Sequence, residues 1–135
     1  MKSLSLYFKL SAVLLILAGA AGINVAVWGL HRRPPAPHHQ VPAADAERGR
    51  ALMTSYGCIT CHMIPGVPGA AGRVGPKLDE FQDRVYIAGV LANSGQNLTY
   101  WIQNPRDVSP ETAMPDLNVS EPDARDMAAY LYSIR

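Results

Sequence analysis

The stretch Cys58-Ile59-Thr60-Cys61-His62 decides how this sequence folds and what chemistry it carries. Its two cysteines are the only ones in the chain and stand three positions apart, so they belong to one site and not to a disulfide framework. Residues three apart lie on the same face of a helical turn, which points both sulfurs the same way. A histidine follows directly. The chemistry of the chain is therefore expected to centre on these five residues.

The C-x-x-C-H spacing is the attachment signature of haem c, in which Cys58 and Cys61 bond one haem edge and His62 reaches the iron. A thioredoxin-like pair usually accompanies a βαβ pattern, and none is predicted here. An ordinary buried cysteine pair would precede a histidine only by chance, because four of the 135 residues are histidine. A zinc site needs four Cys or His ligands, and the other histidines lie far upstream. We predict one covalently attached haem c.

Haem iron needs a ligand on its second face, and the five methionines are the natural candidates. Met114 lies between Pro110 and Pro115, and flanking prolines exclude a helix and favour an extended strap. We predict Met114 as the second iron ligand. The other methionines lie in the N-terminal segment, beside the histidine, or on helical stripes typical of core packing: Met1, Met63, Met53 and Met127.

Apolar periodicity predicts an all-α domain around this motif. A first helix is expected from Asp45 to Gly57, a second over 79–93 and a short third over 98–102. A last helix should begin after the N-cap Ser120 and run to the C-terminus. The glycine-rich and proline-rich segment 63–76 is predicted to be a loop. No segment alternates as a strand would.

The N-terminal part contains a long uncharged segment. Residues 10–30 carry no charge, and their length as a helix, about 31 Å, matches the ~30 Å hydrocarbon core of a bilayer. We predict a single membrane anchor over 1–30. A cleaved signal peptide is the alternative, because Ala18-Gly19-Ala20 resembles a cleavage site, but the apolar run continues to Leu30.

A proline-rich linker is expected to join this anchor to the haem domain. Residues 31–44 contain four prolines, which favour an extended, semi-rigid chain. His38 and His39 in the linker are expected to be solvated and without a role. The haem domain is predicted to occupy 45–135.

The charges are distributed unevenly between these parts. The first 44 residues carry four basic and no acidic residues, and the remaining 91 carry eight basic and 11 acidic ones. A net-acidic domain without a basic patch argues against nucleic acid as a partner.

Residues 45–135 resemble a class I cytochrome c. In that family a small and a bulky residue cross the C-terminal helix, as Gly49 and Met53 would cross it at Met127 and Tyr130. The segment Gly75-Pro76-Lys77-Leu78 resembles the family's Gly-Pro-x-Leu. The resemblance implies that the Pro76 carbonyl accepts the N–H of His62 and that Leu78 packs on the haem.

The segment before the strap also matches this family, at Leu98, Trp101, Ile102, Asn104 and Pro105, although many members have Tyr where this chain has Trp101. Leu98 and Trp101 are therefore expected to line the haem site. Arg84 is either a partner of a haem propionate or a solvated helix arginine.

The anchor and linker resemble those of membrane-bound cytochromes c in bacterial respiratory chains. The resemblance implies a periplasmic haem domain that carries single electrons between a quinol-oxidising complex or dehydrogenase and a terminal oxidase, with no small-molecule substrate. One alternative is a fixed subunit of a larger membrane oxidoreductase. Another is a haem enzyme or gas sensor with an open sixth site, but Glu111 and Asp116 beside Met114 are expected to be solvated and not an acid/base pair.

Overall fold

The computed structural model describes Gly19 and residues 39–134. Apart from Gly19, the predicted anchor lies outside the described residues, as does most of the linker. In the part of the chain that is described, no helix is long and apolar enough to cross a membrane. Residues 39–134 belong to one compact unit.

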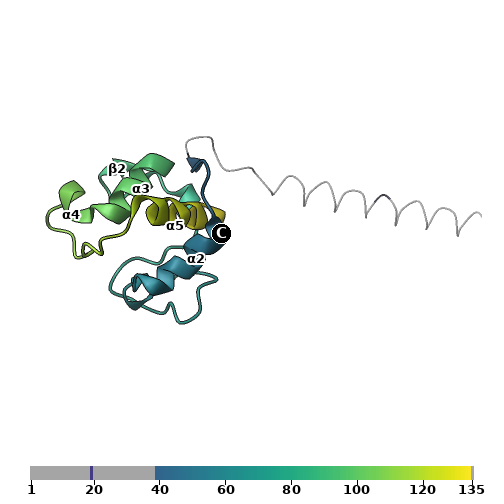
Figure 1. Cartoon of the computed structure of the whole chain (residues 1–135), viewed down its shortest axis with the longest axis horizontal. Helices are drawn as coiled ribbons and strands as arrows, with labels where there is room; N and C mark the ends of the chain where they lie inside the picture. Colours follow the sequence, from purple (N-terminus) through teal and green to yellow (C-terminus); the bar gives the residue numbers. More distant parts are fainter. Residues whose placement is uncertain (1–18, 20–38, 135) are drawn as a thin grey trace, which may run out of the picture. The chain divides into compact units, whose positions relative to one another are not determined.

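Two helices, α2 (Ala46–Ser55) and α5 (Glu121–Ser133), cross at the centre of this unit (Figure 1). The predicted first and last helices are thereby confirmed. A Cβ added to Gly49 would lie 2.0 Å from the Asp126 carbonyl oxygen, so the two backbones meet where only glycine leaves room. Met53 and Met127 flank the crossing and are 2% and 0% exposed.

Polar contacts fix both helix starts and join them. The Asp45 side chain caps α2, and Ser120 caps α5 by accepting from the Asp123 N–H, as predicted. The Arg48 guanidinium pairs with Asp123 and Asp126 of α5, and the Tyr56 hydroxyl donates to Asp123 over 2.6 Å. That hydroxyl, the Ser120 hydroxyl and Arg48 hold the pKa of Asp123 below its usual value.

A third helix, α3 (Gly95–Gln103), packs on α5 and confirms the predicted short helix. It begins at Ser94, whose hydroxyl accepts from the Asn97 N–H. A one-turn helix, α4 (Pro105–Val108), follows it with a proline at its start, where a missing N–H costs nothing. Buried side chains of α2, α3 and α5 form the hydrophobic core with parts of the loops.

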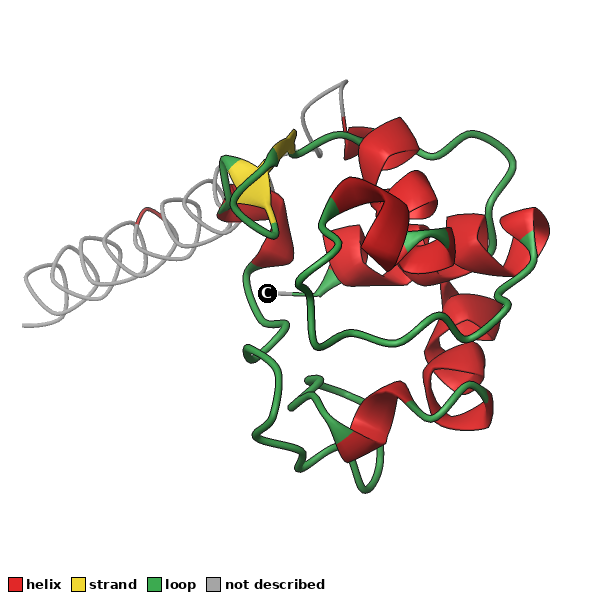
Figure 2. Ribbon diagram, turned by 90° about the vertical axis from the view of Figure 1, so that its left-hand side faces the viewer, coloured by secondary structure: helices red, strands yellow, loops and turns green. Residues whose placement is uncertain are grey.

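The predicted helix over 79–93 is wrong. The segment forms a 3₁₀ turn, η3 (Phe81–Asp83), and an antiparallel hairpin of β1 (Tyr86–Ile87) and β2 (Leu91–Ala92). Figure 2 shows the strands, in yellow, at one edge of the described unit. The domain is therefore helical with a small β-hairpin and not purely α-helical.

The hairpin has a local and a tertiary cause. Ala88 and Gly89 at its tip both have positive φ, 51° and 76°, as the primed hairpin turns require. The buried Asn93 side chain donates to the carbonyls of Phe81 and Arg84, 2.8 Å away in each case. These bonds satisfy backbone groups that a helix would have paired internally.

The end of the linker also differs from the prediction. His39 is 7% exposed and its ring stacks on Tyr132, with centroids 4.7 Å apart, so it is buried and not solvated. The carbonyl of Pro42 accepts from Arg125 of α5. His38 lies outside the described residues. From His39 onward the linker packs on the domain because its apolar and aromatic groups find partners there.

Candidate cofactor site

A largely apolar cavity of ≈ 410 Å³ lies within the described unit. Its walls come from the cysteine motif, the loop that follows it, the hairpin, α3 and the strap after α4. Every site residue that the sequence predicts lines this one cavity: Cys58, Cys61, His62, Pro76, Leu78, Arg84, Leu98, Trp101 and Met114.

The cysteine motif follows a sharp end to α2. Gly57 has φ 75°, the left-handed conformation that commonly ends a helix, and the chain then enters the 3₁₀ turn η2 (Cys58–Thr60). The His62 N–H donates to the Cys58 carbonyl over 3.0 Å, which keeps the motif helical. Cys58 and Cys61 are both free thiols and partly buried. Burial raises the pKa of the Cys58 thiol.

The loop 72–78 fixes the orientation of the His62 imidazole. Its Nδ1 lies 2.7 Å from the Pro76 carbonyl oxygen. A carbonyl can only accept, so Nδ1 donates and Nε2 is left with a lone pair for a metal. Two backbone bonds, from Gly75 to the Cys61 carbonyl (2.8 Å) and from Leu78 to the Met63 carbonyl (2.9 Å), tie the loop to the motif.

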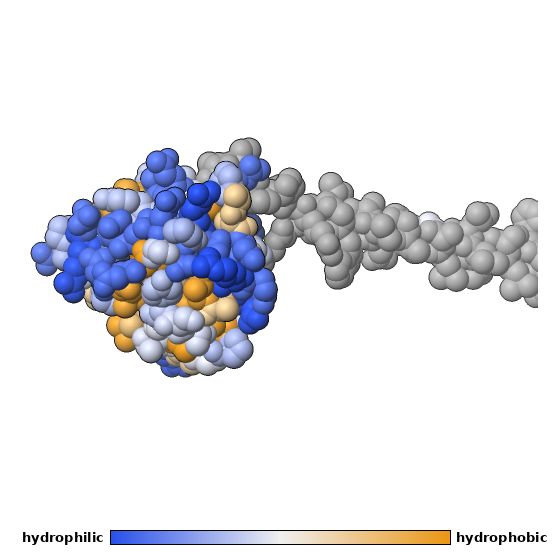
Figure 3. Space-filling view, viewed as in Figure 1, coloured by the Kyte–Doolittle hydropathy of each residue, from blue (hydrophilic) through white to orange (hydrophobic). Residues whose placement is uncertain are grey.

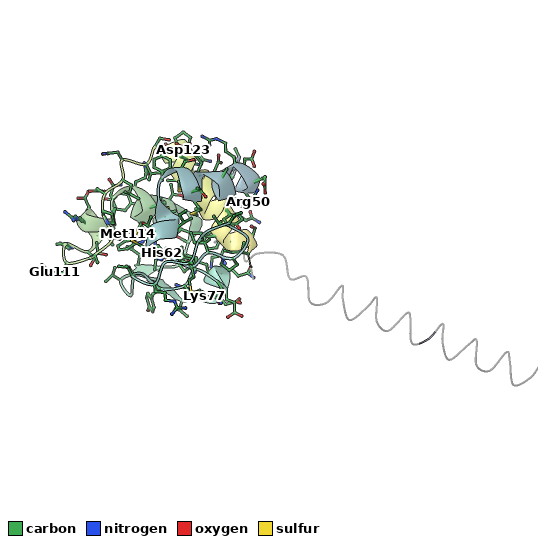
Figure 4. The ribbon with its side chains drawn as sticks, turned by 90° about the horizontal axis from the view of Figure 1, so that it is seen from below. Arg50, His62, Lys77, Glu111, Met114 and Asp123 are labelled. Atoms are coloured by element: carbon green, nitrogen blue, oxygen red, sulfur yellow. The ribbon has the colours of Figure 1, made fainter. Side chains whose placement is uncertain are left out.

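Met114 reaches the cavity from the strap, which is not helical, as predicted. Its N–H donates to the Thr112 hydroxyl over 3.2 Å, and Thr112 lines the cavity as well. Figure 4 shows Met114 and His62 within the domain and Glu111 at its periphery. Glu111 and Asp116 are exposed, as expected for solvated carboxylates.

Two further methionines contribute to the same cavity. Met53 and Met127 are core residues of α2 and α5, as the helical stripes predict, and both also line the cavity wall. They differ from Met114 in lying on regular helices, where neighbouring turns fix the side-chain direction. Met63 is not among the lining residues.

Arg84 does not lie on a helix. The alternative interpretation, that it is a solvated arginine on a helix surface, is therefore wrong. Its guanidinium donates to the carbonyls of Lys77 and Asp79 and lies 5.0 Å from the centroid of the Phe81 ring. The side chain lines the cavity and supplies a positive charge there.

Sequence reasoning missed a buried polar pair beside the cavity. The Tyr132 hydroxyl donates to the Asn93 side-chain oxygen over 2.8 Å, and burial raises the pKa of Tyr132. Phe81 packs edge-on against the Tyr132 ring and lines the cavity. The β-branched and aromatic residues Val85-Tyr86-Ile87, followed by Ala88-Gly89, were the available signal for the hairpin that directly precedes Asn93. The other unpredicted apolar lining residues include Ile87, Ile102, Leu117 and Leu131.

The donor set and the shape fit a covalently bound haem. Two thiols and a histidine with a free Nε2 face an apolar cavity, and a methionine sulfur lies in the wall. A Cβ on Gly75 would lie 2.3 Å from Cε1 of His62, so the loop closes on the ring where only glycine fits.

Comparison with known proteins agrees with this chemistry. The sequence model of the family Cytochrome c matches residues 46–135. Cytochrome c oxidase subunit 2 of Alkalihalophilus pseudofirmus is 36% identical over 91 residues, 67% of this chain and 26% of that protein. The proteins of the same name from Bacillus sp. strain PS3 and Bacillus subtilis are 31% and 29% identical, over 67% and 64% of this chain and 26% and 25% of their own lengths.

The chain thus spans about a quarter of the length of the curated relatives it matches. The match covers the described cavity and its C-x-x-C-H motif, and it implies haem c with its iron as the cofactor, with Cys58 and Cys61 at the attachment positions. This chain belongs to the cytochrome c family, and its membership implies electron transfer through covalently bound haem c.

Proposed function

We propose that this chain is a membrane-anchored carrier of single electrons in a respiratory chain, with His62 and Met114 as the two iron ligands. The observation that carries the proposal is the common cavity: a histidine with a free Nε2 and a methionine from a non-helical strap reach it from different segments of the chain.

The bound haem supplies an iron that changes its charge by one electron. His62 and Met114 would both hold the iron, which would leave no open position for a substrate. Pro76 orients the histidine and strengthens it as a donor through the Nδ1–H bond. The apolar wall, with Leu78, Leu98 and Trp101, excludes water and favours the reduced iron.

Arg84 is proposed to balance a haem propionate. The side chain lines the cavity. Its guanidinium donates to two backbone carbonyls through Nη2, so the other N–H donors of the guanidinium remain for a propionate. A guanidinium is the partner that a buried carboxylate needs.

The proposed electron acceptor is a terminal oxidase, and the donor is a quinol-oxidising complex or a dehydrogenase. The support is the name of the three relatives, cytochrome c oxidase subunit 2. Their greater length favours a second candidate, in which this chain is a fixed subunit of a larger oxidoreductase. Purification in a mild detergent separates the two, because a free carrier leaves its partners and a fixed subunit does not.

The membrane anchor and the periplasmic position of the haem domain remain predictions from the sequence. The uncharged run over 10–30 supports the anchor. Attachment near the membrane suits an electron carrier, because confinement raises its effective concentration at a membrane-bound partner.

A redox titration of the full-length protein in detergent tests the core of this proposal. We expect one-electron behaviour and no binding of carbon monoxide by the reduced protein, because His62 and Met114 would both hold the iron. Rapid carbon monoxide binding would instead identify an open sixth site and favour the sensor or enzyme alternative. Retention in the membrane pellet after alkaline carbonate washing tests the anchor separately.

A further inference from the structure

The hairpin carries both cavity-lining and solvent-exposed apolar side chains. Ile87 is 2% exposed and lines the cavity, whereas the adjacent Tyr86 is 59% exposed. Val85 and Val90 beside it are 72% and 55% exposed. Several large apolar side chains are seldom solvent-exposed on one short element unless they bind a partner. In Figure 3, hydrophobic residues in orange lie in separate groups among polar ones in blue.

The exposed apolar residues belong to a long uncharged segment of the domain. No Asp, Glu, Lys, Arg or His occurs from Val85 to Pro105. Natural sheet edges are usually protected by charged residues, and here the hairpin has none. Tyr, which is the most polar of these exposed residues, is enriched in membrane proteins at the boundary between lipid headgroups and hydrocarbon.

His39, the first residue of the linker that the structure describes, is connected to this hairpin through buried side chains. His39 stacks on Tyr132, and the Tyr132 hydroxyl bonds to Asn93. Asn93 in turn donates its backbone N–H to the Val85 carbonyl over 3.0 Å. A continuous series of contacts therefore leads from His39 to the backbone of the hairpin at Val85.

The chain between this point and the predicted anchor is short. Residues 31–38 separate the uncharged run from His39, and eight residues can span at most about 28 Å in any conformation. If residues 10–30 cross the membrane, the hairpin is held within reach of the bilayer surface on which the linker emerges.

We propose that the apolar side chains exposed on the hairpin, those of Val85, Tyr86 and Val90, rest in the headgroup region of the membrane that holds the anchor. This inference depends on the anchor proposed above. Three side chains would bind lipid weakly on their own, but a short tether makes the contact intramolecular and so raises its occupancy. The contact would hold the domain in one orientation, with the cavity wall on the inner side of the same hairpin.

Photochemical labelling of the full-length, haem-loaded protein tests this contact. The protein is reconstituted into vesicles of phosphatidylethanolamine and phosphatidylglycerol with p-benzoylphenylalanine in place of Tyr86. After illumination, mass spectrometry of the hairpin peptide should show a phospholipid adduct. The matched control places the same residue at Ser55, which is exposed at the end of α2. We expect a yield several times higher at position 86.

A second variant checks that the apolar face causes the contact. Val85→Ser combined with Val90→Ser should lower the lipid adduct at position 86 to the Ser55 level and leave the visible haem spectrum unchanged, because neither side chain lines the cavity. Equal yields at 86 and 55, or an adduct to a second copy of the chain in place of lipid, would overturn the inference. If the protein then still stays in the membrane pellet after carbonate washing and keeps its haem spectrum, the proposed function stands without this contact. Release of the protein from the pellet by carbonate would instead overturn the anchor and this contact together.

Discussion

Gly75 lies against the imidazole of His62 so closely that a Cβ would come within 2.3 Å of Cε1, 2.7 Å of Nδ1 and 2.9 Å of Nε2. The same ring is held by the Pro76 carbonyl, one residue further along. The position of the proposed iron ligand is therefore set by a loop whose backbone leaves no space on that side.

Gly75→Ala is expected to displace the ring and weaken its bond to Pro76. Overpacking of this kind costs about 1 to 3 kcal/mol of unfolding free energy. The visible haem spectrum should change as well, because the displaced imidazole would bind the iron less well. Gly69→Ala is the control: its Cβ meets nothing within 4 Å, but its φ of 77° is strained for alanine. It should lower stability in urea unfolding without altering the spectrum.

Covalent attachment is tested at the two cysteines. The intact mass after denaturation should exceed that of the polypeptide by one haem. Replacing Cys58 and Cys61 together with Ser should abolish this increment, because no thiol then remains in the motif. A haem that acid acetone extracts from the parent protein would contradict the prediction.

Met114→Ala should leave the haem attached and open the sixth position to water or carbon monoxide. The near-infrared sulfur-to-iron band of the oxidised protein should disappear, and the reduction potential should fall, because thioether ligation favours reduced iron. The controls are Met53→Leu and Met127→Leu, which line the same cavity. As volume-conserving swaps they should cost less than ~1.5 kcal/mol and keep the band. If Met114→Ala kept both band and potential, a different residue would hold the iron.

Gly49→Ala tests the helix crossing that supports the site. Its Cβ would lie 2.0 Å from the Asp126 carbonyl oxygen and 2.8 Å from the Met127 nitrogen, both of them backbone atoms that cannot turn aside. We expect a loss of at least about 3 kcal/mol in unfolding free energy. Ala51→Gly, at an exposed position of the same helix, should cost only about 1 kcal/mol. Similar losses for both variants in denaturant unfolding would argue against the close crossing.

The carboxylate of Asp123 should make stability depend on pH in the acid range. Its pKa is lower in the folded protein, mainly through the Tyr56 hydroxyl, so it stabilises the fold above its unfolded pKa of about 3.9. This stabilisation is lost as the pH falls through the folded pKa. Asp123→Asn should therefore be less stable than the parent near neutral pH, and the difference should shrink in strong acid. Thermal unfolding of both proteins across this pH range measures the difference, and a difference that does not change with pH would contradict the prediction.

Features built from near neighbours in the chain could be predicted from the sequence. The motif from Cys58 to His62, the N-cap at Ser120 and the non-helical strap around Met114 depend on contacts within a few residues. The resemblance to a known family added the expectation for Pro76. Because such interactions are local, the residue types and their spacing carry the information.

Only the tertiary structure decided the hairpin, the burial of His39 and the pairing of Asn93 with Tyr132. Asn93 meets a hydroxyl 39 positions further along the chain, and that contact belongs to the folded domain alone. Apolar residues over 79–93 recur at helical spacing, but the segment forms a hairpin, and the Asn93 side chain bonds to the backbone carbonyls of Phe81 and Arg84. The sequence by itself determined the chemistry of this protein. Packing between distant segments determined the walls of the cavity in which that chemistry takes place, since burial and hydrogen-bond partners exist only once the chain has folded.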